Sequence, residues 1–190
     1  LQLSQFWEMD TVLSARGCLK CILTFVDPEI SLFYARLLPC HEPCYVERAF
    51  DTLEKTLGGV YEFQSMLPVI LTDRGSEFGK PDNLETNKDG IIRTSIYYCD
   101  PMRSGQKGCL EEAHTLLRMI LPKGTLFTDL TQWDVRRIVN HMNSYARKNL
   151  EGATPYQLAL KKYGPEILEA LQIKFIPPDE VTMSPDLLKK

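Results

Sequence analysis

The order of the expected elements predicts an α/β protein with a mixed five-stranded sheet flanked by helices. Five runs rich in Ile, Val, Phe and Tyr have the length of strands, and all of them fall in the first hundred residues. An amphipathic helix separates the third run from the fourth, and further helical segments follow residue 100. Three consecutive strands, a crossover helix and a buried strand combine antiparallel with parallel pairing, which places helices on both faces.

Turn residues and apolar patterns set the bounds of the strands. Asp27-Pro28-Glu29 is typical of a turn, so the second and third strands should form a hairpin. The fourth run is short and continuously apolar, as in strands that are buried on both faces. The expected strands are Phe6–Leu13, Leu19–Val26, Ile30–Leu38, Leu67–Leu71 and Thr94–Cys99.

Apolar residues at helical spacing, with capping and breaking residues at the ends, predict the helices. Gly58-Gly59 ends the first helix, Pro122 ends the second, and Thr154-Pro155 is a typical helix start. We expect one main domain over residues 1–164 and a tail over residues 165–190 that is loosely attached after Pro177-Pro178. The expected helices are Cys44–Leu57, Leu110–Leu121, Thr131–Leu150 and a last one from Thr154 to about Tyr163.

The composition is that of a globular protein. Of the 190 residues, 44% are hydrophobic and 25% are charged, which excludes a disordered chain, a collagen and a coiled coil. No apolar run approaches the roughly 18 residues of a membrane span, and no signal peptide is visible. Because the chain opens at Leu1, almost inside its first strand, we expect it to be a fragment of a longer protein.

Charge is distributed unevenly along the chain. Residues 1–100 carry a net charge of −6, residues 101–164 carry +5, and residues 165–190 carry −2. A basic segment beside an acidic one suits a protein that holds a polyanion with one part and cations with the other. The alternative is chance unevenness of a solvated surface.

Three acidic residues stand in apolar surroundings. Asp10 lies inside the first strand, Asp73 directly follows the buried fourth strand, and Glu111 lies near the start of a helix. Three carboxylates brought together need a cation between them, and their hard oxygen atoms suit Mg²⁺ or Mn²⁺. The alternative is a separate capping or surface role for each residue.

Two motifs surround the first two of these carboxylates: Trp7-Glu8-Met9-Asp10-Thr11-Val12 and Thr72-Asp73-Arg74-Gly75-Ser76-Glu77-Phe78. They resemble the strand with the first carboxylate and the motif T-D-N-G-x-E-F of DDE transposases and integrases, and they are most similar to the insertion-sequence-thirty family of bacterial transposases. The segment from Asp100-Pro101 to Glu111 resembles the loop and helix of the third motif. The resemblance covers residues 6–160, and its remaining matches are Leu121–Thr125, Asn143, Arg147-Lys148 and Thr154-Pro155.

The resemblance implies a ribonuclease-H-like fold and a catalytic core over residues 1–164. Asp10, Asp73 and Glu111 match the three catalytic metal ligands, and Glu111 rather than Glu112 is the third because it stands three residues after Gly108. The implied cofactor is Mg²⁺ or Mn²⁺, with two ions when DNA is bound. The implied partners are double-stranded DNA and further copies of the chain, and no membrane is involved. The implied location is the bacterial cytoplasm, at the nucleoid when the protein is bound to DNA.

Basic residues near these motifs are candidates for contacts to the DNA backbone. Arg74 departs from the family, which has Asn beside the second Asp, and Tyr145-Ala146 replace Arg-Pro in the last motif. His114 lies one turn after Glu111 and is expected to contact the scissile phosphate or to orient Glu111; the alternative is a half-buried His. The DNA-binding candidates are Arg74, Lys107, His114, Lys123, Arg147 and Lys148.

The cysteines allow a second, structural metal site. Two pairs stand at the ends of the predicted hairpin strands, where Zn²⁺ ligands could meet, and His41 lies within the second pair. The alternative is that these are free core thiols, since they form no part of the family pattern. The zinc candidates are Cys18, Cys21, Cys40 and Cys44.

Three functions remain open from the sequence. The favoured one is a DDE transposase core that cleaves the 3′ ends of a mobile element and transfers them to target DNA. The second is a DDE-derived module that binds DNA or oligomerises without cutting, which Arg74 favours and the complete acidic triad opposes. The third is another kind of ribonuclease-H-like nuclease, which the segments around Lys123 and Arg147-Lys148 oppose.

Overall fold

A computed structural model describes residues 5–99 and 108–189. Its five strands form one mixed sheet in the order β3-β2-β1-β4-β5, in which β1, β2 and β3 are antiparallel and β4 and β5 run parallel to β1. All five expected strands are therefore confirmed. Their bounds are β1 Trp7–Leu13, β2 Cys21–Asp27, β3 Leu32–Leu38, β4 Val69–Thr72 and β5 Ser95–Tyr98.

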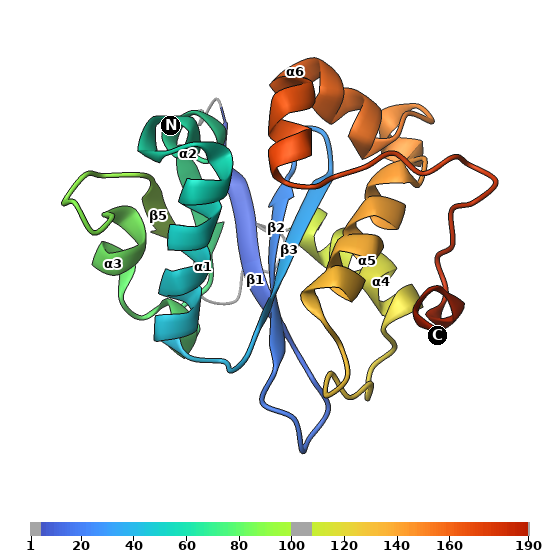
Figure 1. Cartoon of the computed structure of the whole chain (residues 1–190), viewed down its shortest axis with the longest axis horizontal. Coiled ribbons are helices and arrows are strands. Elements are labelled where there is room, and N and C mark those ends of the chain that lie inside the picture. Colours follow the sequence, from blue (N-terminus) through green and yellow to red (C-terminus); the bar gives the residue numbers. More distant parts are fainter. Residues whose placement is uncertain (1–4, 100–107, 190) are drawn as a thin grey trace.

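Helices lie on both sides of the sheet. Figure 1 shows α1, α2 and α3 on one side of the strands and α4, α5 and α6 on the other. The helices are α1 Pro43–Leu57, α2 Val60–Met66, α3 Pro81–Glu85, α4 Gly108–Ile120, α5 Gln132–Ser144 and α6 Pro155–Ala170. Short 3₁₀ turns are Ser76–Phe78, Lys148–Leu150 and Pro185–Leu188. None of the helices in the described ranges is both long and apolar enough to cross a membrane.

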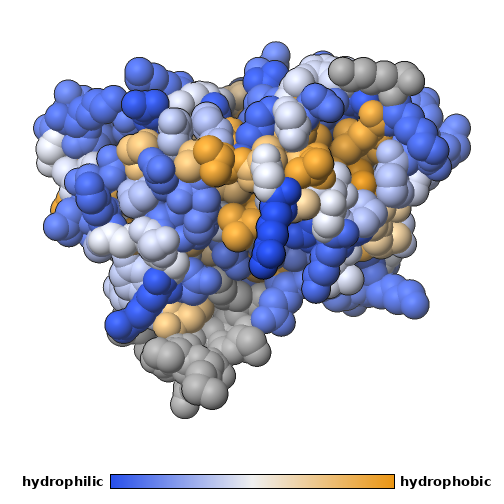
Figure 2. Space-filling model, turned by 90° about the horizontal axis from the view of Figure 1, so that it is seen from below, coloured by the Kyte–Doolittle hydropathy of each residue, from blue (hydrophilic) through white to orange (hydrophobic). Residues whose placement is uncertain are grey.

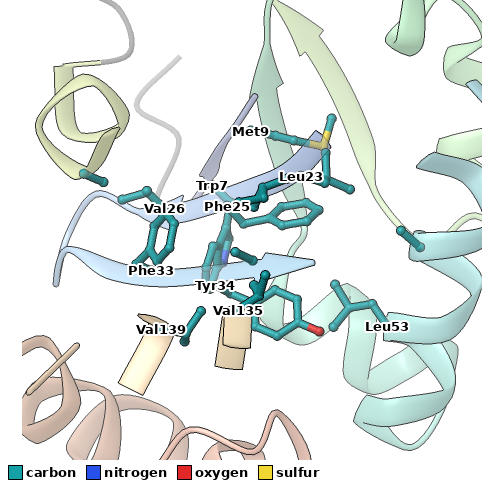
Figure 3. Packing of buried hydrophobic residues seen from close by; sticks show 14 of the residues in the cluster. Trp7, Met9, Leu23, Phe25, Val26, Phe33, Tyr34, Leu53, Val135 and Val139 are labelled. Carbon is teal, nitrogen blue, oxygen red and sulfur yellow. The ribbon is translucent and has the colours of Figure 1, made fainter. Parts of the chain in front are cut away.

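The two faces of β1 pack against different helices. Trp7 and Met9 are fully buried on the face toward α1, where Phe25 of β2 lies 5.9 Å from Phe50, centroid to centroid. Figure 3 shows Trp7, Phe25 and Tyr34 gathered in this core. Since side chains alternate along a strand, the polar residues between the apolar ones point to the opposite face, toward α4.

The long helix expected over Thr131–Leu150 is shorter in the structure. It ends at Ser144, because Tyr145 is extended and the Arg147 N–H donates to Ala153 O at 3.0 Å instead of continuing the helix. Fully buried Asn143 lies beside the edge strand, where its side chain accepts from Phe33 N–H at 2.9 Å and donates to Phe33 O at 2.8 Å. Asn143 thus satisfies backbone groups of β3 that would otherwise stay unpaired.

The C-terminal residues differ from expectation in their packing. α6 continues through the predicted boundary at residue 164, with a kink where Gly164 adopts a φ of 80°. The segment that follows is tied to α5, since Thr182 N–H donates to His141 Nδ1 at 3.0 Å, and Leu187 is buried. The segment is therefore held to α5 at Thr182 and to the core at Leu171, Ile173 and Leu187, where a loosely attached tail was expected.

Candidate functional site

Asp10 and Asp73 lie on neighbouring strands. β1 and β4 pair in parallel with Trp7 opposite Ile70 and Glu8 opposite Leu71, so continuation of this register places Asp10 beside Asp73. The Thr72 hydroxyl, one residue before Asp73, donates to Met9 O at 3.0 Å and holds the two strand ends together. Asp10, in the middle of β1, thus stands beside the carboxyl end of the parallel strand β4, and Asp73 follows at that end, where α/β folds place ligands.

Hydrogen bonds from the backbone hold both carboxylates locally. Asp10 Oδ1 accepts from Thr11 N–H at 2.7 Å, and Asp73 Oδ1 accepts from Gly75 N–H at 2.9 Å. A Cβ at residue 75 would lie 2.5 Å from Glu77 Oε2, so glycine lets the Glu77 carboxylate lie close against this turn. The turn after β4 is therefore compact and fixes the backbone that carries Asp73.

The helix that carries Glu111 docks on the same face as Asp10. Thr24 is the cross-strand partner of Asp10, and its hydroxyl donates to Asp10 O at 3.0 Å. His114 Nε2 lies 2.9 Å from the same hydroxyl oxygen. Because Thr24 has only one hydroxyl hydrogen, we infer that His114 donates through Nε2. The helix that carries Glu111 is therefore tied through His114 and Thr24 to the Asp10 backbone.

Glu111 itself is exposed on α4. Among residues 5–99 and 108–189, no three His, Cys, Asp or Glu side chains form a group that could hold a metal ion. The structure thus brings Asp10 and Asp73 together and directs α4 toward them, but it does not close a three-carboxylate cage. The donor set nevertheless fits Mg²⁺ or Mn²⁺, because each carboxylate provides hard oxygen ligands and such ions keep several waters.

The DNA-binding candidates are dispersed. Arg74 is exposed beside Asp73, with its guanidinium 6.0 Å from the Tyr98 ring centroid. Lys123 is exposed beyond the C-terminal end of α4, and Lys148 is exposed near the turn between β2 and β3, where Asn149 Nδ2 donates to Ser31 Oγ at 3.4 Å. These two lysines therefore lie toward opposite ends of the sheet. Lys107 lies outside the described residues.

Arg147 is not placed to contact DNA. Its side chain is only 5% exposed, and its Nη2 donates to Met142 O at 3.1 Å. Nε and Nη1 have no hydrogen-bond partner in the part of the chain that the structure describes. Burial lowers the pKa of this guanidinium from its usual value. The sequence shows only that residue 147 is an arginine and does not indicate that its side chain is buried.

Figure 2 shows the end of the molecule toward which β1 runs. An apolar band crosses this end, with hydrophilic side chains around it. The hairpin between β1 and β2 lies here and is joined to the loop after α4 by a hydrogen bond from Ala15 N–H to Thr125 O at 3.1 Å. Exposed apolar residues of these two segments are Leu13, Leu19 and Leu126. This end of the molecule therefore exposes apolar side chains among hydrophilic ones.

The predicted zinc site is not assembled. Cys18 lies against Ser14 and Thr128, and Cys44 Sγ lies 3.9 Å from Glu42 Oε2, and among the described residues no three His, Cys, Asp or Glu side chains form a group that could hold a metal ion. Cys21 is fully buried, and burial raises the pKa of its thiol to about 12, which keeps it protonated. These cysteines are free thiols in the structure.

Two acidic residues near the site were not singled out from the sequence. Glu8 is 3% exposed, and its Oε2 accepts from Leu110 N–H in α4 at 2.7 Å. Glu77 is 4% exposed and lies 2.7 Å from both His41 Nε2 and the Thr11 hydroxyl, which donates to it. Glu8 could have been noticed, because it stands two residues before Asp10 and so shares its face of the strand.

The five-stranded mixed sheet with helices on both sides is a ribonuclease-H-like fold. Solved structures confirm this fold class. The catalytic core domain of BIV integrase matches with a TM-score of 0.57 and 18% identity, over 84% of this chain and 95% of that one. The HTLV-2 integrase catalytic core domain in complex with magnesium, in a trimeric form, matches with a TM-score of 0.55 and 17% identity, over 80% of this chain and 93% of that one.

Curated relatives are transposases and integrases of mobile elements. No protein-family model matches the chain. The transposase for insertion sequence element IS4351 of Bacteroides fragilis is 26% identical over 148 residues, which are 78% of this chain and 42% of the relative. The putative integrase ORF3 of Spiroplasma virus SpV1-R8A2 B is 29% identical over 155 residues, 81% of this chain and 45% of that protein.

The resemblance to the insertion-sequence-thirty family is also confirmed. Transposase InsI for insertion sequence element IS30A of Escherichia coli strain K12 is 32% identical over 87 residues, 45% of this chain and 21% of the relative. The chain thus spans less than half the length of the curated relatives that it matches.

Proposed function

We propose that the chain is the catalytic core of a DDE transposase, which cleaves the 3′ ends of a mobile element and joins them to target DNA. The observation that carries the proposal is the pairing of β1 with β4, which sets Asp10 beside Asp73 under the helix that bears Glu111. The similarity to transposases and integrases over about four fifths of the chain supports it.

In this proposal Asp10, Asp73 and Glu111 hold Mg²⁺ or Mn²⁺, with two ions when DNA is bound. The ions would activate an attacking oxygen and stabilise a leaving oxygen at phosphorus. The three carboxylates bind the cations and set their place relative to the DNA strand, while Thr24 and His114 hold the backbone that carries Asp10 and Glu111. A cation among them would offset the mutual repulsion of the three carboxylates.

The direct test is an end-cleavage assay with double-stranded DNA that carries the element's terminal repeats. We expect the chain, joined to the flanking regions of its own gene, to cleave and transfer 3′ ends in Mg²⁺ or Mn²⁺ and to do neither in EDTA. Inverted repeats on both sides of the gene would supply the substrate and identify a mobile element. Absence of cleavage with both metals on those ends would contradict the proposal.

The second candidate is a DNA-binding or oligomerising module without catalysis. The specific observation in its favour is Arg74, a cation directly beside Asp73. Binding of the terminal repeats by a protein that never cleaves them, with any divalent metal, would favour this module over the transposase core.

Arg74 gives a separate prediction about DNA affinity. We propose that Arg74, Lys123 and Lys148 contact DNA phosphates, with Arg74 nearest to the carboxylates. Arg74→Asn should weaken DNA binding and reduce the slope of log affinity against log salt by about one, since one phosphate contact is lost. Fluorescence anisotropy over a salt series measures both values.

Arg48→Asn is the matched control for this prediction. Arg48 is also exposed, and its guanidinium lies 5.4 Å from the Tyr45 ring centroid. It belongs to α1, which lies on the side of the sheet opposite α4, the helix that carries Glu111. We expect its replacement to leave the slope unchanged. Equal slopes for the parent and Arg74→Asn would remove Arg74 from the DNA interface.

As a transposase core, the chain would act as a homo-oligomer on DNA in the bacterial cytoplasm, at the nucleoid. One structural neighbour is a trimeric form of an integrase core, and another is part of a simian T-cell lymphotropic virus intasome. Light scattering of the chain with and without terminal-repeat DNA would give the number of subunits.

A further inference from the structure

Glu8 is a buried carboxylate that touches the helix of the third catalytic candidate. It lies on β1 with 3% of its surface exposed, and its Oε2 accepts from Leu110 N–H at 2.7 Å. Leu110 is the third residue of α4, so this N–H is one of those that a helix leaves without an internal partner. A carboxylate is favourable at such an end, because the N–H groups and the helix dipole both stabilise negative charge.

A second polar contact joins α4 to β2, and through it to β1. His114 Nε2 lies 2.9 Å from the Thr24 hydroxyl, which donates to Asp10 O at 3.0 Å. The two contacts are at Leu110 and His114, one residue before Glu111 and three residues after it. The turn that carries Glu111 is therefore tied at both of its ends to residues at or beside Asp10.

We propose that Glu8 is a positioning residue that fixes the Glu111 backbone relative to Asp10, and so sets the geometry in which these carboxylates receive a divalent cation. The inference rests on the proposed function and deepens it. Glu8 and Asp10 are two residues apart and point to the same face of β1, so one rigid strand carries the first metal ligand and the anchor of the third.

The energetics argue for a role beyond packing. Burial of a carboxylate is costly, and an apolar side chain at the same place would often pack α4 at least as well. An apolar side chain cannot accept the directional hydrogen bond from the Leu110 N–H. That hydrogen bond fixes the rotation of α4 about its axis relative to β1. Groups that orient metal ligands in this way typically change metal affinity by about 10–100-fold when they are removed.

The test compares Mn²⁺ affinity, from electron paramagnetic resonance of free Mn²⁺, with hydrogen exchange at the Leu110 amide, both on the 190-residue chain. In Glu8→Leu we expect Mn²⁺ binding to weaken about 10–100-fold and the Leu110 amide to exchange faster. Glu8→Gln keeps an oxygen that can accept the same hydrogen bond, so it should retain most of the affinity and the slow exchange.

Glu85→Leu is the matched control. Glu85 Oε1 also accepts a backbone N–H at 2.7 Å, that of Ile96, at the far edge of the sheet. Its loss should lower stability without changing Mn²⁺ affinity. An unchanged affinity in Glu8→Leu, or an equal loss in Glu8→Leu and Glu8→Gln, overturns the positioning role, since the latter would be an effect of charge alone.

Failure of the proposed function gives a different result. In that case the parent chain and Asp10→Asn bind Mn²⁺ equally, whatever residue stands at position 8. That outcome overturns the transposase proposal and, with it, any positioning of ligands by Glu8. If Asp10→Asn loses Mn²⁺ and Glu8→Leu does not, only the inference on Glu8 falls.

Discussion

Replacement of Asp73 by Asn is expected to lower Mg²⁺-dependent cleavage and strand transfer by about a thousandfold or more. The change removes one negative charge from the place where the cations are held, and loss of several kcal/mol of charge stabilisation has an effect of this size. Gel assays on terminal-repeat DNA, at saturating Mg²⁺, measure both steps.

The fold should survive this replacement. Asn retains an oxygen at the position of Asp73 Oδ1, which accepts from Gly75 N–H at 2.9 Å, so the turn after β4 keeps its hydrogen bond. Thermal stability without metal should stay equal or rise, because repulsion among Asp10, Asp73 and Glu111 is relieved. Asp89→Asn, at an exposed loop position, is the control and should cleave normally. An Asp73→Asn protein that cleaves like the parent would show that these carboxylates are not the catalyst.

Replacement of Arg93 by Met is expected to destabilise the chain by about 3–5 kcal/mol, the usual cost of removing one partner from a buried ionic network. Arg93 is 1% exposed. Its Nη1 lies 3.0 Å from Asp51 Oδ1 and 3.2 Å from Glu54 Oε2, and its other nitrogens donate to the carbonyl oxygens of Asn83 and Leu84. The Met side chain cannot donate hydrogen bonds, so the carboxylates of Asp51 and Glu54 and the carbonyls of Asn83 and Leu84 would lose this partner.

The measurement is the unfolding midpoint by calorimetry or circular dichroism. For a chain of this size 1 kcal/mol shifts the midpoint by roughly 2–4 °C, so the expected fall is roughly 6–20 °C. Lys88→Met is the control, since Lys88 pairs with the same Asp51 at 2.8 Å but its side chain is 80% exposed. That exposed pair should contribute no more than about 1 kcal/mol. Equal shifts for the two variants would contradict the role assigned to Arg93.

The strands were predictable because buried strands consist of short runs of consecutive apolar residues, which are visible in the sequence. β2 reads Cys-Ile-Leu-Thr-Phe-Val-Asp and is buried at every position, and the short apolar run before Asp73 marks β4. α2 was missed because seven residues after Gly58-Gly59 are too few for helical periodicity to stand out. The end of α5 was missed because it depends on a bond from Arg147 to Ala153, a contact that no periodicity reports.

The candidate site was predictable only in part. Asp10 inside one predicted strand and Asp73 at the end of another were singled out from apolar surroundings and from a family resemblance, and the strand pairing places them together. The inward turn of Arg147 and the bond from Glu8 to α4 depend on how helices dock after the sheet has formed. A sequence gives the polar character of such residues but not the direction in which tertiary packing turns them. The zinc expectation failed for the same reason, since Cys18 and Cys44 face different neighbours.

The central claim is that Asp10, Asp73 and Glu111 receive divalent metal between the middle of β1 and the carboxyl end of β4. Anomalous scattering from crystals of the chain soaked in Mn²⁺ tests it most directly. We predict an anomalous peak from a Mn²⁺ ion that is coordinated by carboxylate oxygens of Asp10 and Asp73, with the Glu111 side chain of α4 turned toward the ion. Mn²⁺ bound at other carboxylates, with no peak between Asp10 and Asp73 at concentrations that saturate the chain, would contradict the account.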